Sequence, residues 1–415
     1  MTSALGVMTR AVVVATAPGA LAVVGGLPLA VRAVLTLREL GVSEIGVVAG
    51  AQDPAVAAAL GRRGLTSATD GLSTLAASAA PALVVGGDVL FDGAVLAPLL
   101  ASVDSDPAQV VRPPGTHPGH VWAAVCSGAV VSALVSHLRR GALTLDEAWK
   151  AVGPPAAVSI RPGEGLCLQL DVDHPAGALT QALLVDQARN AAATDGYLAA
   201  LLDRHLSRFL TRRLLVWPVT PNQITVVSII VGLAGALGLA TVSYTARLAG
   251  VLALLASSVL DGVDGELARA RREQSPLGAR LDLAGDYAVN LAAFVGLGTG
   301  LGRQGLPPHG LWAAIILLLG VGAAMGTMHA LFNRPALRVS DDLHGPRGGA
   351  GFAATPVAAA VEKIAGRDYT YFLLVAALAG RLEWFLYAAA AGAWAFVASL
   401  LAYFFCRREV RSTTV

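Results

Sequence analysis

Four aspartates stand in a part of the sequence that is otherwise strongly apolar: Asp261, Asp264, Asp282 and Asp286. A charged side chain at the middle of a bilayer costs roughly 2.5–3.5 kcal/mol on insertion scales. These carboxylates must therefore face a polar cavity and be neutralised there. Oxygen ligands alone suit Mg²⁺ or Mn²⁺, and Mg²⁺ commonly binds together with substrate phosphates. The residue types thus predict a divalent metal site for phosphate chemistry.

The spacing of the aspartates indicates how they come together. Asp261 and Asp264 are separated as i and i+3, and Asp282 and Asp286 as i and i+4, so each pair lies on one face of a helix. The segment Ser275–Gly278 contains Pro276 and interrupts the chain between the pairs. We therefore expect two antiparallel helices that direct four carboxylates at one point.

Small residues and an arginine accompany the first pair. Gly265 and Ala268 leave room for a bulky group against the backbone, and Arg269 supplies a planar fork for phosphate oxygens. One alternative is that the aspartates form intramembrane ion pairs with Arg269 or Arg280. Another is that they line an ion or proton pathway, as in a transporter.

The C-terminal half contains long apolar stretches, each of which compares with the ~20 residues needed to cross a bilayer. They predict six transmembrane helices, over about 222–242, 246–267, 283–302, 309–332, 366–380 and 384–405. Arginines are concentrated before the first stretch, between the second and third, between the fourth and fifth, and after the sixth. The positive-inside rule then predicts a multi-pass protein of the inner or plasma membrane, with both termini and the aspartates on the cytoplasmic side.

The segment 195–216 precedes the first apolar stretch and is amphipathic. Its apolar residues recur at helical spacing opposite several arginines; they are Leu198, Leu201, Leu202, Leu206, Phe209 and Leu210. This pattern predicts an interfacial helix on anionic headgroups, and a plain linker helix is the alternative.

The N-terminal half has a different hydropathy pattern, with short apolar runs in place of long ones. Short apolar runs at Ala11–Ala15, Ile45–Val48 and Ala82–Val85 read as buried parallel strands. Helical patterns lie between them, such as Leu29–Leu40 with Arg32 and Arg38 on its polar side. Alternation of strands and helices predicts a doubly wound α/β domain.

Composition bounds the classes of protein. The 415 residues are 55% hydrophobic and only 14% charged, whereas about 25% is usual for soluble domains. This excludes a disordered, collagen-like or wholly soluble chain. The net charge of +2 argues against a nucleic-acid partner. The three widely spaced cysteines argue against a disulfide framework.

The pattern D-x-x-D-G-x-x-A-R-x8-G-x3-D-x3-D, formed by residues 261–286, resembles the signature of the CDP-alcohol phosphatidyltransferase family. The stretch Thr220–Thr225 resembles the start of the family's first membrane helix. The segment LDGVDGELAR resembles one branch of the family. Proteins of this branch carry a nucleotidyltransferase-like domain ahead of the membrane domain, and the branch includes di-myo-inositol-phosphate-phosphate synthases. The resemblance covers about 195–408 well and 10–185 loosely.

The resemblance implies an enzyme that moves a substituted phosphate from a CDP-alcohol to an acceptor alcohol and releases CMP. It implies two metal ions, with Asp261, Asp264 and Asp282 as main ligands and Asp286 as a shared ligand or the base. Asn222 and Thr225 would meet the cytidine or its phosphates, beside Gly265, Ala268, Arg269 and Gly278. The donor could be lipid-linked or a soluble CDP-polyol, and the family suggests a homodimer.

An acceptor that carries a phosphate, such as a phosphorylated polyol, would need a basic pocket near the metals. Arg280, Arg334 and Arg367 are cytoplasmic by the predicted topology and are candidates. The alternative is that they only set the topology. His329 is expected to be structural.

The front half resembles nucleotidyltransferases at Gly25–Leu29, at Gly87-Asp88, and at Asp171 and Asp173, where an acidic residue would complete a metal site. Those enzymes place an Arg and a Pro-Lys before the Gly-x-Pro-Leu turn. Here the stretch is ATAPGALAVVGG, without Arg or Lys. An uncompensated triphosphate binds poorly, so we expect weak or absent nucleotidyl transfer. An active cytidylyltransferase that makes the donor is the alternative.

Together these patterns predict a degenerate cytidylyltransferase-like domain over 1–190, an interfacial helix over 195–216, and a transmembrane phosphotransferase domain of six helices over 217–410.

Overall fold

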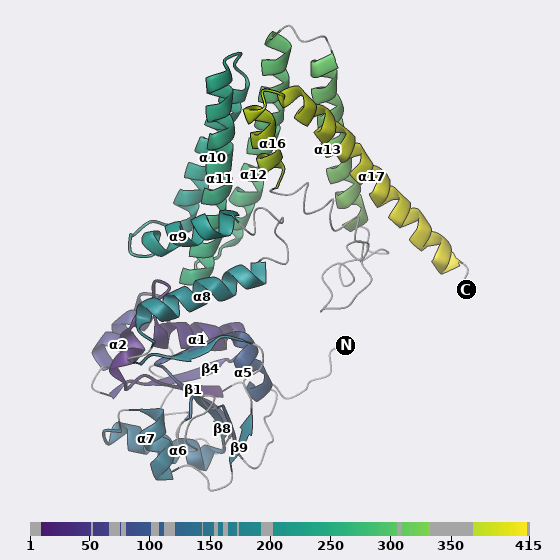
Figure 1. Cartoon of the computed structure of the whole chain (residues 1–415). Helices are drawn as coiled ribbons and strands as arrows, with labels where there is room; N and C mark the ends of the chain where they lie inside the picture. Colours follow the sequence, from purple (N-terminus) through teal and green to yellow (C-terminus); the bar gives the residue numbers. More distant parts are fainter. Residues whose placement is uncertain are drawn as a thin grey trace. The chain divides into compact units, whose positions relative to one another are not determined.

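The computed structural model describes residues 10–50, 53–65, 75, 80–100, 108–111, 121–142, 144–152, 157–160, 165–171, 174–191, 202–304, 309–332 and 368–412. The chain divides into two compact units, Met1–Asp186 and Gln187–Val415. The first is built around a β-sheet and the second is helical (Figure 1).

The first unit contains a six-stranded sheet in the order β4-β1-β5-β8-β7-β9. The strands are β1 Arg10–Val14, β4 Glu44–Val48, β5 Ala82–Gly86, β7 Ala108–Val111, β8 Ala123–Cys126 and β9 Ala157–Ile160. β1 pairs in parallel with both β4 and β5, as the three apolar runs predict. β8 runs antiparallel to β5 and β7, so the sheet is mixed.

Helices cover both faces of this sheet, which makes three layers. Ala11 and Val13 of β1 pack on one face with residues of α1 Leu29–Glu39, α2 Asp53–Gly61 and α5 Gly93–Leu100. Val12 and Val14 pack on the other face with α6 Gly128–Arg139 and α7 Leu145–Val152. Because successive side chains of a strand point to opposite faces, an all-apolar strand is the expected consequence of burial on both sides.

Smaller elements join one end of the sheet. They are the 3₁₀ helix η1 Pro18–Leu21, the hairpin of β2 Val23–Val24 and β3 Leu27–Pro28, the antiparallel pair of β6 Val89–Phe91 and β10 Cys167–Gln169, and α8 Ala176–Ala191. Gly25 and Gly26 form the hairpin turn with φ of +57° and +79°, which glycine adopts readily.

The predicted place of Arg32 on the polar side of its helix is wrong. Arg32 is only 3% exposed, and its guanidinium donates hydrogen bonds to the carbonyls of Val24 (2.8 Å) and Gly25 (3.2 Å). Arg32 is buried because its guanidinium binds two carbonyls of the β2–β3 hairpin turn. Arg38 is exposed as predicted.

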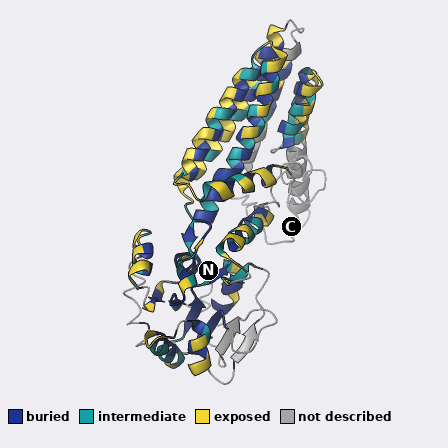
Figure 2. Ribbon diagram, turned by 60° about the vertical axis from the view of Figure 1, so that its left-hand side comes forward, coloured by how far each residue is buried: buried dark blue, intermediate teal, exposed yellow. Residues whose placement is uncertain are grey.

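The second unit contains a helix near each of the six apolar stretches. The helices are α10 Pro221–Leu239, α11 Tyr244–Arg271, α12 Pro276–Arg303, α13 His309–Phe332, α16 Tyr369–Leu378 and α17 Leu382–Ser412, and the shorter α9 Arg204–Leu214 precedes them. One apolar core is shared by all six, with Leu239, Leu254, Leu297, Leu317, Leu373 and Leu386 among its residues. Figure 2 shows buried residues on the inner faces of this bundle and exposed ones on its outer faces.

Glycines let α10, α11 and α12 approach each other backbone to backbone. A Cβ atom at Gly250 would lie 2.6 Å from the Gly235 carbonyl oxygen, and one at Gly300 only 2.1 Å from that of Leu239. Small residues at such crossings are characteristic of tightly packed membrane helices. The close approach packs both α11 and α12, which carry the aspartates, against α10.

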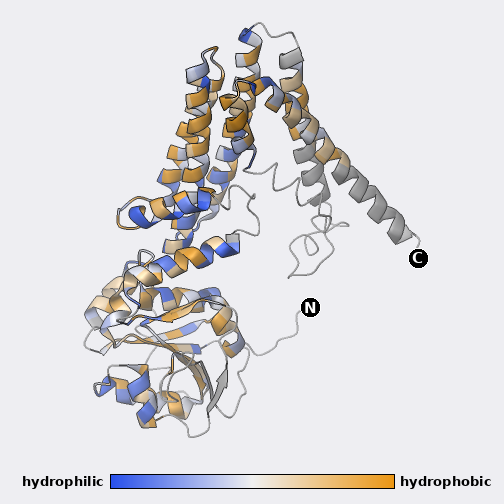
Figure 3. Ribbon diagram, viewed as in Figure 1, coloured by the Kyte–Doolittle hydropathy of each residue, from blue (hydrophilic) through white to orange (hydrophobic). Residues whose placement is uncertain are grey.

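Two of the described helices, α10 and α11, are long and apolar enough to cross a membrane. Figure 3 shows hydrophobic residues along most of both helices and mainly hydrophilic ones in α9. α12 contains the charges of the motif in its first half, and its apolar residues follow them. The number of membrane crossings therefore stays a prediction.

The amphipathic segment forms a helix within the part that the structure describes, but its arginines do not all oppose its apolar residues. Leu206 and Phe209 are exposed, whereas Arg204, Ser207 and Thr211 form the buried face. The buried face is polar because it meets an acid on α11, as described below. Leu198 and Leu201 lie outside the described residues.

Candidate active site

The carboxylates of Asp261, Asp264 and Asp282 converge between α11 and α12. Each offers one oxygen, and these oxygens all lie within 4.8 Å of one another. Asp264 is 5% exposed, and the other two are partly buried. The helical spacing predicted this convergence of both motif halves, and the structure brings these three residues together.

The chain reverses between the two helices through specific local signals. α11 ends at Arg272, whose φ of +51° is in the left-handed region that terminates helices. Ser275 then caps α12, its hydroxyl accepting a hydrogen bond from the Gly278 amide at 3.0 Å, and Pro276 occupies the first helical position. This short reversal sets the second pair of aspartates beside the first.

The three carboxylates fit a divalent cation. Asp282 Oδ1 is buried and has no hydrogen-bond partner among the described residues. Like charges this close need a counter-charge, and a buried acceptor without a donor is costly. A cation held by oxygen ligands satisfies both conditions, and carboxylates alone suit Mg²⁺ or Mn²⁺.

Asp286 stands apart from this group of three. It lies one turn beyond Asp282 on α12, is exposed, and lines the cavity that Asp261 and Asp282 also line. The cavity has a volume of about 240 Å³ and lies between α10, α11, α12 and α16. Asp286 is therefore placed to meet a molecule in the cavity.

Thr225 lines the same cavity and contacts one of the three carboxylates. Its hydroxyl donates a short hydrogen bond to Asp264 Oδ2, and the side chain is only 4% exposed. A buried donor of this kind fixes the orientation of a carboxylate ligand. The contact of Thr225 with the cytidine or its phosphates, which the family resemblance implies, stays a prediction.

Asn222 and Gly278 meet where α10 and α12 begin. A Cβ atom at Gly278 would lie 2.8 Å from Asn222 Oδ1, so glycine is needed for this approach. Asn222 itself is exposed at the end of α10. Its helix begins with a capping box in which Gln223 donates to Thr220 Oγ1 and the Thr220 amide donates back at 2.9 Å.

The space beside Gly265 is occupied by the guanidinium of Arg269, from the same helix. A Cβ atom at Gly265 would lie 3.1 Å from Arg269 Nη1, so the guanidinium packs over the glycine backbone. Arg269 and Ala268 are both partly buried. The guanidinium is thus held over Gly265, the residue that directly follows Asp264.

The described residues do not show the three candidate acceptor arginines together in one pocket. Arg280 is exposed on α12 and does not line the cavity in the described part of the chain. Arg334 and Arg367 lie outside the described residues, as does the side chain of His329.

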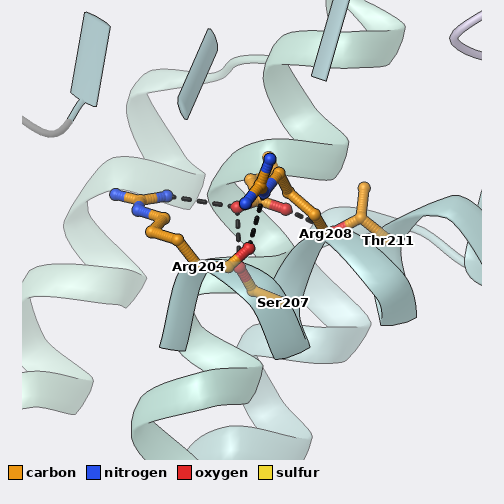
Figure 4. Close-up of polar contacts among 5 residues, drawn as sticks. Arg204, Ser207, Arg208 and Thr211 are labelled. Atoms are coloured by element: carbon orange, nitrogen blue, oxygen red, sulfur yellow. Dashed lines mark hydrogen bonds and ion pairs between the residues drawn. The ribbon is translucent and has the colours of Figure 1, made fainter. Parts of the chain in front are cut away.

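Sequence reasoning missed a third acid on α11, Glu266. Glu266 is fully buried. It lies two residues after Asp264, which corresponds to about 200° of helix rotation, so its side chain points away from the three carboxylates. It accepts hydrogen bonds from Ser207 (2.7 Å) and Thr211 (2.8 Å) and pairs with Arg204 (3.2 Å), as Figure 4 shows. A charge inside an apolar stretch was the signal that could have marked it.

Arg271 completes the attachment of α9. It is 9% exposed and donates to four backbone carbonyls that follow the helix, those of Leu214, Leu215, Trp217 and Val219. Carbonyls at the end of a helix have no partner within it. Arg271 and Glu266 therefore tie α9 to the motif helix at two points.

The acids of the first unit have partners of their own. Asp88 Oδ2 accepts a hydrogen bond from Gln169 (3.0 Å), which in turn accepts one from Trp122 (2.9 Å). Burial raises the pKa of the Asp88 carboxyl, and the Gln169 bond lowers it in part. Asp171 accepts from the His174 amide at 2.6 Å, and Asp173 lies outside the described residues.

The stretch Ala15–Gly26 packs over Asp88. A Cβ atom at Gly19 would lie 2.9 Å from Leu170 Cδ2 and 3.3 Å from Asp88 Cβ. The loop is thus folded as η1 and the β2–β3 hairpin, in contact with the acid.

A bundle of apolar helices with three converging aspartates between two of them is an arrangement that could hold a divalent cation. Comparison with known proteins makes this specific. Residues 218–401 match the model of the CDP-alcohol phosphatidyltransferase family, so the C-terminal part of the chain contains a domain of this family. The resemblance of the motif is confirmed.

Three curated relatives share one printed name, bifunctional IPC transferase and DIPP synthase. The protein from Thermococcus kodakarensis is 35% identical over 39% of this chain and 35% of its own length. That from Aquifex aeolicus is 33% identical over 30% and 28%, and that from Rubrobacter xylanophilus 35% identical over 32% and 30%. The matched region spans about a third of the length of these relatives.

Proposed function

We propose that the helical unit transfers a substituted phosphate from a CDP-alcohol to an acceptor alcohol and releases CMP. The observation that carries this proposal is the convergence of Asp261, Asp264 and Asp282 inside a domain of the CDP-alcohol phosphatidyltransferase family. The shared name of the curated relatives supports a transferase, and it favours donors and acceptors of the inositol phosphate class.

The three carboxylates would hold the divalent cations, which neutralise charge on the diphosphate of the donor. Thr225 orients Asp264. The family resemblance implies that Asn222, Gly278 and Arg269 would bind the nucleotide. Asp286 takes the proton of the acceptor hydroxyl, whose oxygen forms a bond to the phosphorus next to the donor alcohol. The bond between that phosphorus and the CMP oxygen breaks, so atoms and charge balance.

The bilayer is proposed as the environment of this unit. The exposed residues of α10 include Val226, Ile230, Leu233 and Leu237, which suit lipid or a second copy of the chain. With six crossings, the arginine-rich connections and both termini face the cytoplasm, and so does the aspartate group. A homodimer would cover part of the exposed apolar surface.

A metal-ion or proton transporter is a second candidate for the same carboxylates. Asp282 Oδ1, buried and without a partner in the described part, favours cation binding of either kind. The family match and the arginine packed over Gly265 favour the transferase. A transporter would give ion flux in liposomes without dependence on a CDP-alcohol.

The direct test replaces Asp282 with Asn in the full-length chain and measures Mg²⁺-dependent CMP release from a panel of CDP-alcohols. A bound metal is worth several kcal/mol to the transition state, and ~1.4 kcal/mol corresponds to tenfold in rate. We therefore expect a fall of at least ~100-fold. Glu383→Gln, which changes an acid elsewhere in the unit, should keep the wild-type rate. Full activity in Asp282→Asn would reject the assignment.

A further inference from the structure

Glu266 occupies the side of α11 that faces away from the three carboxylates. It lies two residues after Asp264 and five after Asp261, and at about 100° per residue these separations place it roughly 160° and 140° around the helix from them. The side chain is fully buried and does not line the cavity that the described residues form. A buried charge in an apolar helix is costly. Metal binding on the opposite side of α11 does not account for it.

The Glu266 carboxylate is held by three donors from one face of α9. Ser207 and Arg204 donate to Oε1 at 2.7 Å and 3.2 Å, and Thr211 donates to Oε2 at 2.8 Å (Figure 4). The donors are three and four residues apart, which places them on one side of their helix. Because both oxygens are bonded to the same neighbouring helix, α11 cannot turn at this level without breaking at least one bond.

Hydrogen bonds therefore hold the motif part of α11 on two sides. On the side of the carboxylates, the Thr225 hydroxyl of α10 donates to Asp264 Oδ2. On the opposite side, α9 binds Glu266. A rotation of α11 in either direction would strain both contacts. The aspartates of this helix thus sit between two directional attachments.

The other contacts of α11 select its rotation less well at this level. The backbone approach of α10 at Gly250 lies roughly 21 Å before Asp264, at 1.5 Å per residue. Beside Glu266, the apolar side chains of Val263 and Leu267 pack with leucines of α9. Apolar packing is non-directional, so it stabilises the contact between the helices without choosing one rotation.

A small rotation is enough to spoil a metal site. Side chains end roughly 5–6 Å from the helix axis, so a turn of about 20° moves a carboxylate by about 2 Å. Metal–ligand distances are held to within about 0.2 Å. A misplacement of about 1 Å in an active site can cost about 100-fold in rate. The ligand geometry on α11 therefore depends on whatever fixes its rotation.

We propose that Glu266 is a positioning residue for the metal ligands: its bonds to α9 fix the rotation of α11 at which Asp261 and Asp264 meet Asp282. The inference rests on the proposed function and adds a residue outside the cavity on which the metal geometry depends. A buried ion pair often adds little stability over apolar residues of similar size. Its directional bonds are what apolar residues cannot replace.

Two sets of substitutions in the full-length chain separate direction from stability. The hydrogen-bonded set, Glu266→Gln with Arg204→Leu, keeps an amide that can bond to Ser207 and Thr211. The apolar set, Glu266→Leu with Arg204→Leu, Ser207→Ala and Thr211→Val, fills the same space without directional bonds. Both sets should keep a Tm near that of the wild type, because apolar residues commonly replace a buried ion pair without loss of stability.

Mn²⁺ affinity is the decisive measurement, because it requires no turnover. It is obtained without substrate from the electron paramagnetic resonance signal of free Mn²⁺. The apolar set should bind Mn²⁺ about 10–100-fold more weakly, as is typical when groups that orient metal ligands are changed. The Mg²⁺ concentration for half-maximal CMP release should rise in parallel. The hydrogen-bonded set should bind Mn²⁺ as the wild type does.

Tyr371→Phe is the matched control. The Tyr371 hydroxyl donates a short hydrogen bond to Asp203, which is buried beside the start of α9, so this variant loosens α9 from α16 and leaves Glu266 intact. Its Mn²⁺ affinity should equal that of the wild type, even with a lower Tm. If the apolar set does not fold, Ser207→Ala with Thr211→Val replaces it, and a severalfold weaker Mn²⁺ affinity is expected.

Three results would overturn the proposal. They are wild-type Mn²⁺ affinity in the folded apolar set or in its replacement, an equal loss in the hydrogen-bonded and apolar sets, and the same loss in Tyr371→Phe. Failure of the proposed function looks different, because the wild-type chain would then bind Mn²⁺ but release no CMP from any CDP-alcohol. A wild-type chain that binds no Mn²⁺ would overturn both.

Discussion

Thr225 and Asp264 show how one hydrogen bond can tune a charged site. The Thr225 hydroxyl is buried, and its bond to Asp264 Oδ2 orients this carboxylate. Asp261 and Asp282 lie close enough to share a cation with it. The orientation of Asp264, a candidate metal ligand, therefore depends on Thr225, which is not itself a candidate ligand.

Removal of this bond gives a prediction about metal affinity. Thr225→Val keeps the shape of the side chain and removes its donor, so Asp264 loses its fixed orientation. Changes to groups that orient metal ligands typically cost about 10–100-fold in metal affinity or activity. We expect the Mg²⁺ concentration for half-maximal CMP release to rise within this range, together with a smaller Mg²⁺-induced rise in Tm.

Thr225→Ser is the control, since it retains a hydroxyl, and it should behave like the wild type. Equal Mg²⁺ dependence in Thr225→Val and the wild type would show that the bond does not contribute to metal binding.

At the scale of elements, α9 is attached to α11 by polar groups that lie inside the protein. Glu266 contacts three side chains of α9, and Arg271 binds the carbonyls that follow it. The opposite face of α9 leaves Leu206 and Phe209 exposed, with Arg213 stacked 5.3 Å from the ring centre of Phe209. This arrangement suits a helix at a bilayer surface, with lipid contacts outside and a fixed orientation to the motif helix inside.

The buried pair predicts a large loss of stability when one partner is removed. Glu266→Ala leaves Arg204 without its buried carboxylate, and breaking a buried ion pair costs about 3–5 kcal/mol. We expect a clear fall in Tm of the detergent-solubilised chain. The pair Arg381–Glu383 provides the comparison, because it is 3.5 Å apart with Arg381 69% exposed, and Glu383→Gln should cost at most about 1 kcal/mol. Similar Tm values for the two variants would contradict the role given to Glu266.

Much of the element layout is contained in local sequence. The apolar stretches predicted α10, α11, α12, α13, α16 and α17, and three short apolar runs predicted β1, β4 and β5. The aspartate convergence followed from helical spacing and a proline-containing turn. These features depend on residues close in sequence, whose periodicity is visible directly.

Other features depend on partners far along the chain. A four-residue apolar run such as Ala123–Cys126 does not encode its direction, so the antiparallel position of β8 could not be read from it. Glu266 finds Arg204 and Thr211 through packing of two helices. The burial of Arg32 depends on carbonyls that only the folded β2–β3 turn presents. Cavity residues such as Ser228 and Asn290 gain meaning only when four helices surround one space.

At the scale of the whole molecule, the two units pose the question of whether the chain makes its own CDP-alcohol. The first unit has a three-layer α/β arrangement, and Asp88 follows β5 by two residues. The sequence resemblance predicts a metal site of the nucleotidyltransferase type at Gly87-Asp88. Three curated relatives are named as bifunctional, but the chain matches only about a third of their length. We therefore use the local structure around Asp88 to choose between an active and an inactive cytidylyltransferase.

We predict that the first unit does not transfer a cytidylyl group. The stretch 15–26 has no Arg or Lys for a triphosphate, and its Gly19 packs against Leu170 and Asp88. Anionic phosphates need charge-assisted donors, and none is supplied by this stretch. The full-length Asp282→Asn variant, given CTP, Mg²⁺ and myo-inositol 1-phosphate, should release pyrophosphate no faster than the same chain that also carries Asp88→Asn. Pyrophosphate release that Asp282→Asn retains and Asp88→Asn removes would instead make the chain bifunctional, with Asp88 in a working metal site. Without such release, the CDP-alcohol must come from a separate cytidylyltransferase, and the first unit serves the chain in another way.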